Sequence, residues 1–137
     1  MLTIRREQMI VFKKQAEERF IDRMVLYLRK QFSEETAAYS DKALRARIRN
    51  ELTGAKRFHL ISERAICYYL NLSIMYGEGF MDREDALWMR DYLTDPDVPD
   101  PSERMYRLYQ AVIKKLEVEA DHQRIMAEFN KSTKVGA

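Results

Sequence analysis

Histidine, cysteine and carboxylate side chains are the residues of this sequence that could carry chemistry, and their spacing decides which chemistry is available. The two histidines, His59 and His122, lie far apart, and neither has a second histidine or cysteine three or four positions away. Zinc needs three or four such ligands. We therefore predict no metal site and no cofactor.

Three aspartates in a short proline-rich segment raise the alternative of a calcium loop. Asp95, Asp97 and Asp100 lie in the segment Asp95–Pro101, which also holds all three prolines of the chain. Calcium loops need further oxygen ligands, a glycine turn and a bidentate glutamate. We interpret the segment as a stiff connector whose aspartates cap the next helix.

Nucleophile and acid–base pairs are also weakly supported. Cys67 and His59 could be read as a nucleophile and its base, but Cys67 lies in an apolar segment, where a thiol keeps a high pKa. Glu63 and Glu78 could be paired as acid and base, although any two carboxylates could. No phosphate-binding glycine loop or nucleophile motif is present in the sequence. We therefore predict that the protein is not an enzyme.

Basic residues form one dense cluster, which raises the alternative of a small nucleic-acid-binding regulator. Phosphate binding requires a basic face that acidic groups do not oppose. The net charge is only +2, so we expect nucleic acid to be an unlikely partner. The residues of this basic patch are Arg45, Arg47, Arg49, Lys56 and Arg57.

Charge is unevenly distributed along the chain. Residues 1–60 carry 14 Lys and Arg against 8 Asp and Glu, whereas residues 61–104 carry 4 against 10. The two parts either attract each other within the fold or present patches of opposite sign to a partner. We expect solvated helix faces to account for most of these charges.

The hydrophobic spacing predicts helices throughout. Apolar side chains recur every three or four residues in 4–32, 42–53 and 101–129, as on one face of a helix. Gly54 is the expected residue just after the second helix, because glycine enters the left-handed region cheaply. The last of these helices has a stripe that thins after Leu116, so its end should project or fray.

An apolar segment, Glu63–Tyr76, predicts the central helix. Ser62 is its expected N-cap and Gly77 its end. Most sides of this helix are apolar, which is typical of a helix surrounded by protein. Asn71 and Ser73 are the strongly polar members of its interior and need hydrogen-bond partners if they are buried.

The fold class that follows is all-α: a single-domain bundle of about five helices, two of them long and amphipathic, around the central apolar helix. A short helix over 83–93, capped by Asp82, completes the set. We assign residues 1–130 to the bundle and residues 131–137 to a disordered C-terminal tail.

Large aromatic and methionine side chains gather near the glycine-rich corner Gly77–Gly79. The chain has 8 Met, 8 Tyr, 6 Phe and 1 Trp, residue types that fill cores and also serve in adaptable interfaces. Whether this corner is exposed or core is open at this point. The predicted partner-binding residues are Tyr76, Phe80, Met81, Trp88 and Tyr92.

No uncharged run reaches the ~20 residues needed to cross a bilayer. The single cysteine excludes a disulfide within the chain and favours a reducing compartment. We expect a cytoplasmic protein without membrane contact, and self-association stays open.

A set of residue patterns covers most of the first 110 residues and consists of helix-face patterns without a catalytic signature. The patterns are Ile4–Met9, Phe20 with Arg23–Met24 and Tyr27–Arg29, Phe32, Ile61 with Glu63–Arg64, Tyr76–Gly77 with Phe80, and Arg104–Tyr109. Together they resemble a family of small all-helical accessory proteins encoded in bacterial type VI secretion clusters, near effector and spike-tip genes.

The resemblance implies a bacterial cytoplasmic accessory protein. The expected function is a non-enzymatic interaction module, an adaptor or co-chaperone that helps to load a secreted effector. The alternative within the same class is an immunity protein that neutralises a cognate toxin. The expected partner is a secreted effector or its chaperone.

Overall fold

The structure is a computed structural model that describes the backbone of residues 6–135 and the side chains of residues 13–131. Within that part of the chain all regular structure is helical, which confirms the all-α prediction. The α-helices are α1 Arg6–Gln31, α2 Ser33–Thr36, α3 Asp41–Arg57, α4 Glu63–Tyr76, α5 Leu87–Leu93 and α6 Pro101–Val135. Two short 3-10 helices, η1 Phe80–Asp82 and η2 Glu84–Ala86, precede α5.

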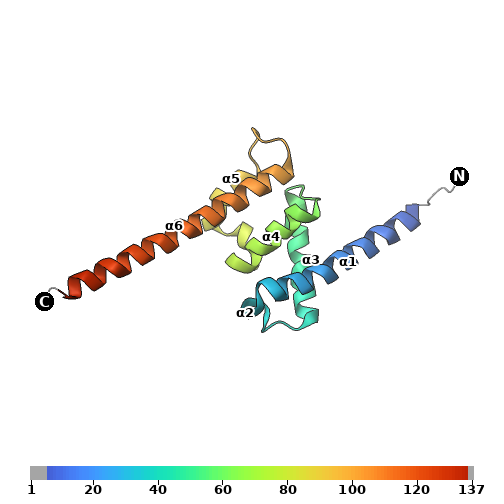
Figure 1. The fold of residues 1–137 in the computed structure, drawn as a ribbon. Helices are drawn as coiled ribbons and strands as arrows, with labels where there is room; N and C mark the ends of the chain where they lie inside the picture. The colour runs from blue at the N-terminus through green and yellow to red at the C-terminus, as the bar shows by residue number, and fades with distance from the viewer. Residues whose placement is uncertain (1–5, 136–137) are drawn as a thin grey trace.

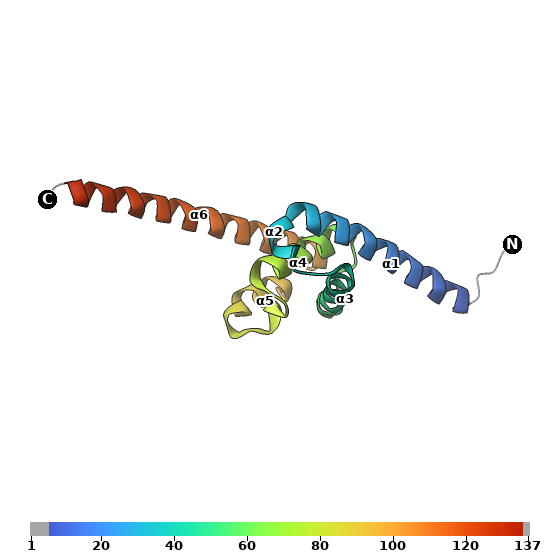
Figure 2. The same ribbon diagram turned by 90° about the horizontal axis from the view of Figure 1, so that it is seen from below.

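The two long helices leave a compact centre in opposite directions. Helices α3, α4 and α5 lie at this centre, while α1 and α6 carry the two ends of the chain away from it (Figures 1 and 2). The C-terminal part of α1 and the N-terminal part of α6 supply the side chains with which these two helices join the buried clusters.

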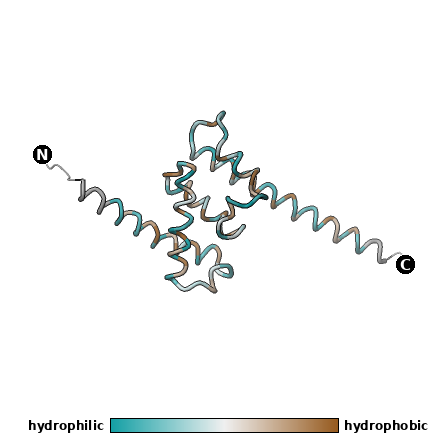
Figure 3. The backbone as a smooth tube through the Cα atoms, turned by 180° about the vertical axis from the view of Figure 1, so that it is seen from behind, coloured by the Kyte–Doolittle hydropathy of each residue, from teal (hydrophilic) through white to brown (hydrophobic). Residues whose placement is uncertain are grey.

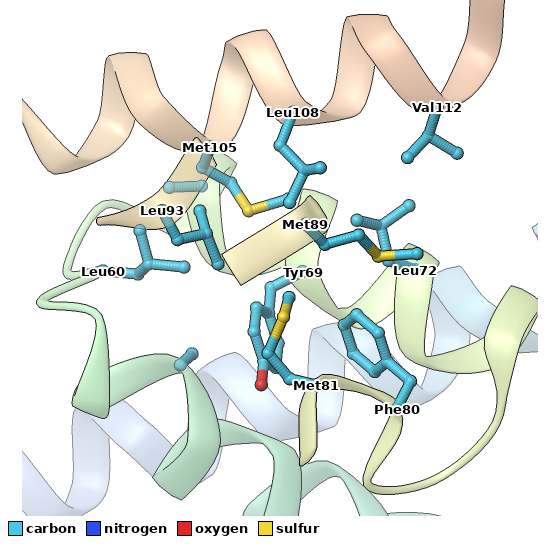
Figure 4. Packing of buried hydrophobic residues seen from close by; sticks show 12 residues of the cluster. Leu60, Tyr69, Leu72, Phe80, Met81, Met89, Leu93, Met105, Leu108 and Val112 are labelled. Atoms are coloured by element: carbon cyan, nitrogen blue, oxygen red, sulfur yellow. The ribbon is translucent and has the colours of Figure 1, made fainter. Parts of the chain in front are cut away.

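Helix α4 is the central helix, as its apolar sequence predicts. Two clusters of buried side chains meet at it: one is shared with α5 and α6, the other with α1 and α3. Tyr69 and Leu72 of α4 belong to the first cluster, and Leu70 belongs to the second. Figure 4 shows the first cluster, with Met105, Leu108 and Val112 of α6 packed over α4 and α5.

Both polar residues inside α4 are buried, and their side chains make hydrogen bonds. The Asn71 amide nitrogen donates to the hydroxyl oxygens of Tyr27 at 3.1 Å and Tyr109 at 3.3 Å, while its amide oxygen has no partner among the described residues. Arg47 donates to the Ser73 hydroxyl at 3.3 Å and to its backbone carbonyl oxygen at 2.7 Å. These bonds tie α1, α3 and α6 to the central helix at points where an unpaired polar group would cost stability.

Local signals set both ends of α4 as expected. The Ser62 hydroxyl accepts a hydrogen bond from the Ala65 N–H at 3.1 Å, which is an N-cap. Gly77 follows the helix with φ 104°, a backbone conformation that favours glycine.

The end of α3 corrects the sequence interpretation. Gly54 lies inside the helix, which continues to Arg57, and the left-handed residue is His59 with φ 61°. A Cβ atom on Gly54 would lie 2.7 Å from the Tyr69 hydroxyl oxygen. The absence of a side chain at position 54 therefore serves helix packing and not helix termination.

Two other boundaries differ from the sequence interpretation. The expected helix over 83–93 is η2 followed by α5, and Asp82 belongs to η1 and does not cap it. Helix α6 reaches Val135, so five of the seven residues of the expected tail lie in a helix. The last two residues, 136–137, and residues 4–5 of the first expected helix lie outside the described residues.

Candidate functional site

The five residues of the predicted aromatic patch divide between the core and the surface. Phe80 and Met81 are 0% and 1% exposed and belong to the cluster under α6. The Phe80 ring lies 5.2 Å from that of Tyr69 and 6.4 Å from that of Tyr76. These two predicted partner-binding residues therefore form core, because the 3-10 turn after Gly79 directs them inward.

The other three residues lie at the edge of the molecule. Tyr76 and Trp88 are half-buried, and Tyr92 is 37% exposed. Trp88 and Tyr92 meet edge to face at 6.4 Å, and the Lys115 ammonium of α6 lies 4.8 Å from the Trp88 ring centre. The cation contact holds α5 against α6.

The basic patch is engaged by acidic residues of α1. Arg45 pairs with Glu18 at 2.6 Å and also with Asp22. Arg49 pairs with Glu18 at 2.8 Å, and this hydrogen bond lowers the pKa of the Glu18 carboxyl. Lys56 Nζ lies 3.8 Å from Glu17. These contacts join α3 to α1.

The remaining two basic residues face other parts of the fold. Arg47 donates to the Tyr39 hydroxyl at 2.8 Å as well as to Ser73. Arg57 pairs with Asp82 at 2.9 Å. All five predicted basic residues thus have partners within the fold, which differs from the unopposed face that phosphate binding requires.

The opposite charges of the first and middle parts of the chain do meet within the fold. Arg23 of α1 pairs with Glu63 of α4 at 2.6 Å, and the Arg57–Asp82 pair adds a second link. The charge distribution left two alternatives: attraction within the fold, or charged patches for a partner. These ion pairs support attraction within the fold.

The candidates for chemistry are not brought together. His59 and His122 are both exposed, on the α3–α4 connection and on α6. Among the described residues no group of three or more His, Cys, Asp or Glu side chains could hold a metal ion. Burial raises the pKa of the half-buried Cys67 thiol, as expected for a structural cysteine.

One aspartate of the proline-rich segment caps the next helix as expected: Asp100 accepts from the Ser102 N–H at 3.1 Å at the start of α6. Asp95 differs from the expectation, because it accepts from the Asp97 N–H at 2.9 Å within the connector. Glu63 and Glu78 have separate partners, Arg23 and Asn50.

A run of exposed apolar side chains lies on residues that the sequence interpretation did not select as a site. We call residues 116–131 of α6 the α6 arm; every one of its side chains is exposed. The large apolar members are Leu116, Val118, Ile125, Met126 and Phe129, exposed from 37% to 60%. Figure 3 shows hydrophobic and hydrophilic residues mixed along this arm, with no other element beside it.

The arm residues have the spacing of a helix-pairing seam. Val118, His122, Ile125 and Phe129 follow one another at steps of four, three and four. Alternation of three and four places residues on one face of a helix. The arm therefore carries an uncovered stripe of three apolar side chains and His122.

A second feature that sequence reasoning missed is a buried carboxylate. Glu51 is 4% exposed and accepts the Gly79 N–H at 3.0 Å. It lines a cavity of about 250 Å³ with Tyr69, whose pKa burial raises to about 12. No sequence signal marks Glu51, because it sits in a helix among many exposed charged residues.

Comparison with known proteins adds no relative: no family model matches the chain, and no curated protein or solved structure matches it significantly. No helix among the described residues combines the length and the hydropathy of a membrane-spanning segment.

Proposed function

We propose that the protein is a non-enzymatic interaction module, an adaptor or co-chaperone for a type VI secretion effector, and that it binds a client helix along the α6 arm. The observation that carries the interaction role is the uncovered stripe of Val118, Ile125 and Phe129, exposed by 58%, 60% and 59%. Contiguous exposed apolar side chains are typical of protein-binding surfaces. The link to secretion comes from the resemblance of the residue patterns.

The client surface that fits this stripe is an amphipathic helix. The seam spacing suits helix-to-helix packing, and α5 already packs in this way on the preceding turns of α6. A helix of the client would lie along the arm beyond Leu87, the first residue of α5, which is 58% exposed.

Folding physics also favours a partner on the arm. The arm is about 24 Å long, at 1.5 Å per residue, and its side chains are exposed throughout. Isolated helices of such length are marginal in water, since most helix stability comes from tertiary packing. A bound client helix would supply that packing and stabilise the arm.

Co-expression with the product of the neighbouring effector gene tests the proposal. Wild-type protein should co-purify with the effector and raise its soluble yield, and the triple variant Val118→Ser, Ile125→Ser, Phe129→Ser should lose both effects. Leu26→Ser is the matched control, because Leu26 is 73% exposed on α1 and lies outside the arm. Equal co-purification by the triple variant would remove the arm as the interface.

Two further readouts separate the alternatives. An adaptor should leave the toxicity of the effector intact, whereas an immunity protein should rescue cells that express it. Light scattering of the purified protein measures self-association. If the wild type and Leu26→Ser are dimers and the triple variant is a monomer, the arm binds a second copy of the chain.

A further inference from the structure

The cavity beside Glu51 is assembled from three segments that are distant in the sequence. Helix α3 supplies Glu51 and Gly54, α4 supplies Tyr69, and the turn around η1 supplies Gly79 and Asp82. Its volume of about 250 Å³ is several times the roughly 30 Å³ that one water occupies in the liquid. The cavity is therefore large enough to hold a small organic group.

The Glu51 carboxylate is only partly satisfied by the protein. Its Oε1 atom accepts the Gly79 N–H, which anchors the turn, while Oε2 accepts no hydrogen bond from the described residues. No lysine, arginine or histidine in that part of the chain pairs with it. An ionised carboxylate can accept about four hydrogen bonds, and a buried one is costly unless it is paired. Anchoring the turn accounts for one oxygen of Glu51, which lines the cavity, and the second oxygen is not among the fully buried atoms that lack a hydrogen-bond partner, so a group in the cavity can reach it.

The walls of the cavity carry a net negative charge. Two carboxylates, Glu51 and Asp82, line it against one guanidinium, Arg57. Arg57 is held by Asp82 at 2.9 Å and does not neutralise Glu51. The electrostatic environment thus favours a positively charged occupant.

The absence of a side chain at Gly54 brings the Tyr69 hydroxyl close to α3. That hydroxyl oxygen would lie 2.7 Å from a Cβ atom on Gly54, so only glycine allows this approach. Figure 4 shows the Tyr69 oxygen directed away from α6, at the far end of a ring that packs beside Met81. The lining of the cavity therefore combines the Glu51 carboxylate, the Tyr69 side chain with its hydroxyl, and the Met81 side chain.

We propose that this cavity binds the primary ammonium or guanidinium group of a cationic ligand, with Glu51 as the counter-ion. A lysine or arginine side chain of a protein partner and a free alkylamine share this chemistry. The cation would donate to Glu51 Oε2, and its alkyl stem would lie against Met81 and the Tyr69 ring. The site is independent of the α6 arm, since it lies between α3, α4 and η1.

A titration followed by amide NMR tests the site with defined probes. N-acetyl-lysine amide should shift the Gly79 amide signal in a saturable way, because that amide donates to the same carboxylate. The probe acetylated on its side-chain nitrogen has lost its charge and should cause no saturable shift. If the charged and the neutral probe behave alike, or neither shifts Gly79, the proposal is wrong.

Variants and a second probe sharpen the result. Glu51→Gln keeps an acceptor for Gly79 and should weaken binding of N-acetyl-lysine amide at least tenfold, whereas Glu84→Gln removes an exposed carboxylate nearby and should change it little. Equal weakening by both would show only general attraction and would overturn the site. If N-acetyl-lysine amide binds more tightly than n-butylammonium, the ligand is a lysine side chain of a protein segment. If n-butylammonium binds more tightly, the ligand is a free amine.

Discussion

Burial changes the acidity of the Tyr69 hydroxyl, and this makes stability depend on alkaline pH. The pKa of Tyr69 rises from 10.0 to about 12, first because the side chain is buried and second because Glu51 is negatively charged. Between these values the unfolded chain has lost the proton that the folded chain keeps. The free energy of unfolding should therefore fall as pH rises through this range.

The expected loss is about 2–3 kcal/mol, since one unit of pKa corresponds to about 1.4 kcal/mol. Urea unfolding at a series of alkaline pH values measures it, and Tyr69→Phe is the reference that keeps every other titrating group. The difference in unfolding free energy between the two proteins should shrink as pH rises. A difference that does not change with pH would contradict the prediction.

Gly54 and Tyr69 should be energetically coupled. Gly54→Ala would place a Cβ atom 2.7 Å from the Tyr69 hydroxyl oxygen, so we expect a loss of about 1–3 kcal/mol despite the better helix propensity of alanine. In the Tyr69→Phe background that oxygen is gone, and the same substitution should be neutral or stabilise by up to about 1 kcal/mol. A double-mutant cycle from urea unfolding measures the coupling, and additive effects would contradict it.

At the scale of elements, α6 is one helix with two environments. Its first turns bury Met105, Leu108 and Val112, whereas every side chain of the arm is exposed. The same 3.6-residue geometry continues across both parts, so secondary structure does not reveal where tertiary packing stops. The stripe that thins after Leu116 indicated this point in the sequence.

Removing the arm should leave the remaining fold intact. A chain that stops after Glu117 should keep its unfolding free energy within about 0.5 kcal/mol, because exposed residues without tertiary partners contribute little. Circular dichroism should show less helix, and client binding should be lost. A drop in stability above about 2 kcal/mol would mean that the arm packs against the centre.

At the scale of the whole molecule, charge is used mainly between the chain's own helices. Glu18 and Asp22 of α1 engage Arg45 and Arg49 of α3, while Arg57 engages Asp82. Such exposed pairs contribute little stability individually. Their consequence is that four of the five basic-patch residues, Arg45, Arg49, Lys56 and Arg57, are paired with acidic groups.

We accordingly expect no specific association with nucleic acid. Fluorescence anisotropy with a short labelled DNA duplex at low salt should show no saturable binding at micromolar protein. Glu18→Gln, which frees Arg45 and Arg49 from one partner, is the sensitised control and should bind more than the wild type. Tight wild-type binding that falls steeply with added salt would contradict this expectation.

Sequence alone determined the features that depend on neighbouring residues. The helical class follows from hydrophobic spacing. The limits of α4 follow from Ser62, whose hydroxyl caps the first turn, and from Gly77, whose backbone conformation ends the helix. The apolar character of Glu63–Tyr76 was sufficient to place it at the centre of the fold. These are short-range effects, so they can be read without knowing what packs against them.

Tertiary structure decided which side chains reach the surface. Phe80 and Met81 turned inward, Gly54 proved to be a packing position, and Glu51 met Gly79 across the fold. Each outcome depends on contacts between segments more than ten residues apart, which spacing cannot reveal. The apolar stripe of the α6 arm is a further example. Its helical pattern is visible in the sequence, but only the assembled fold shows that no other element among the described residues covers it.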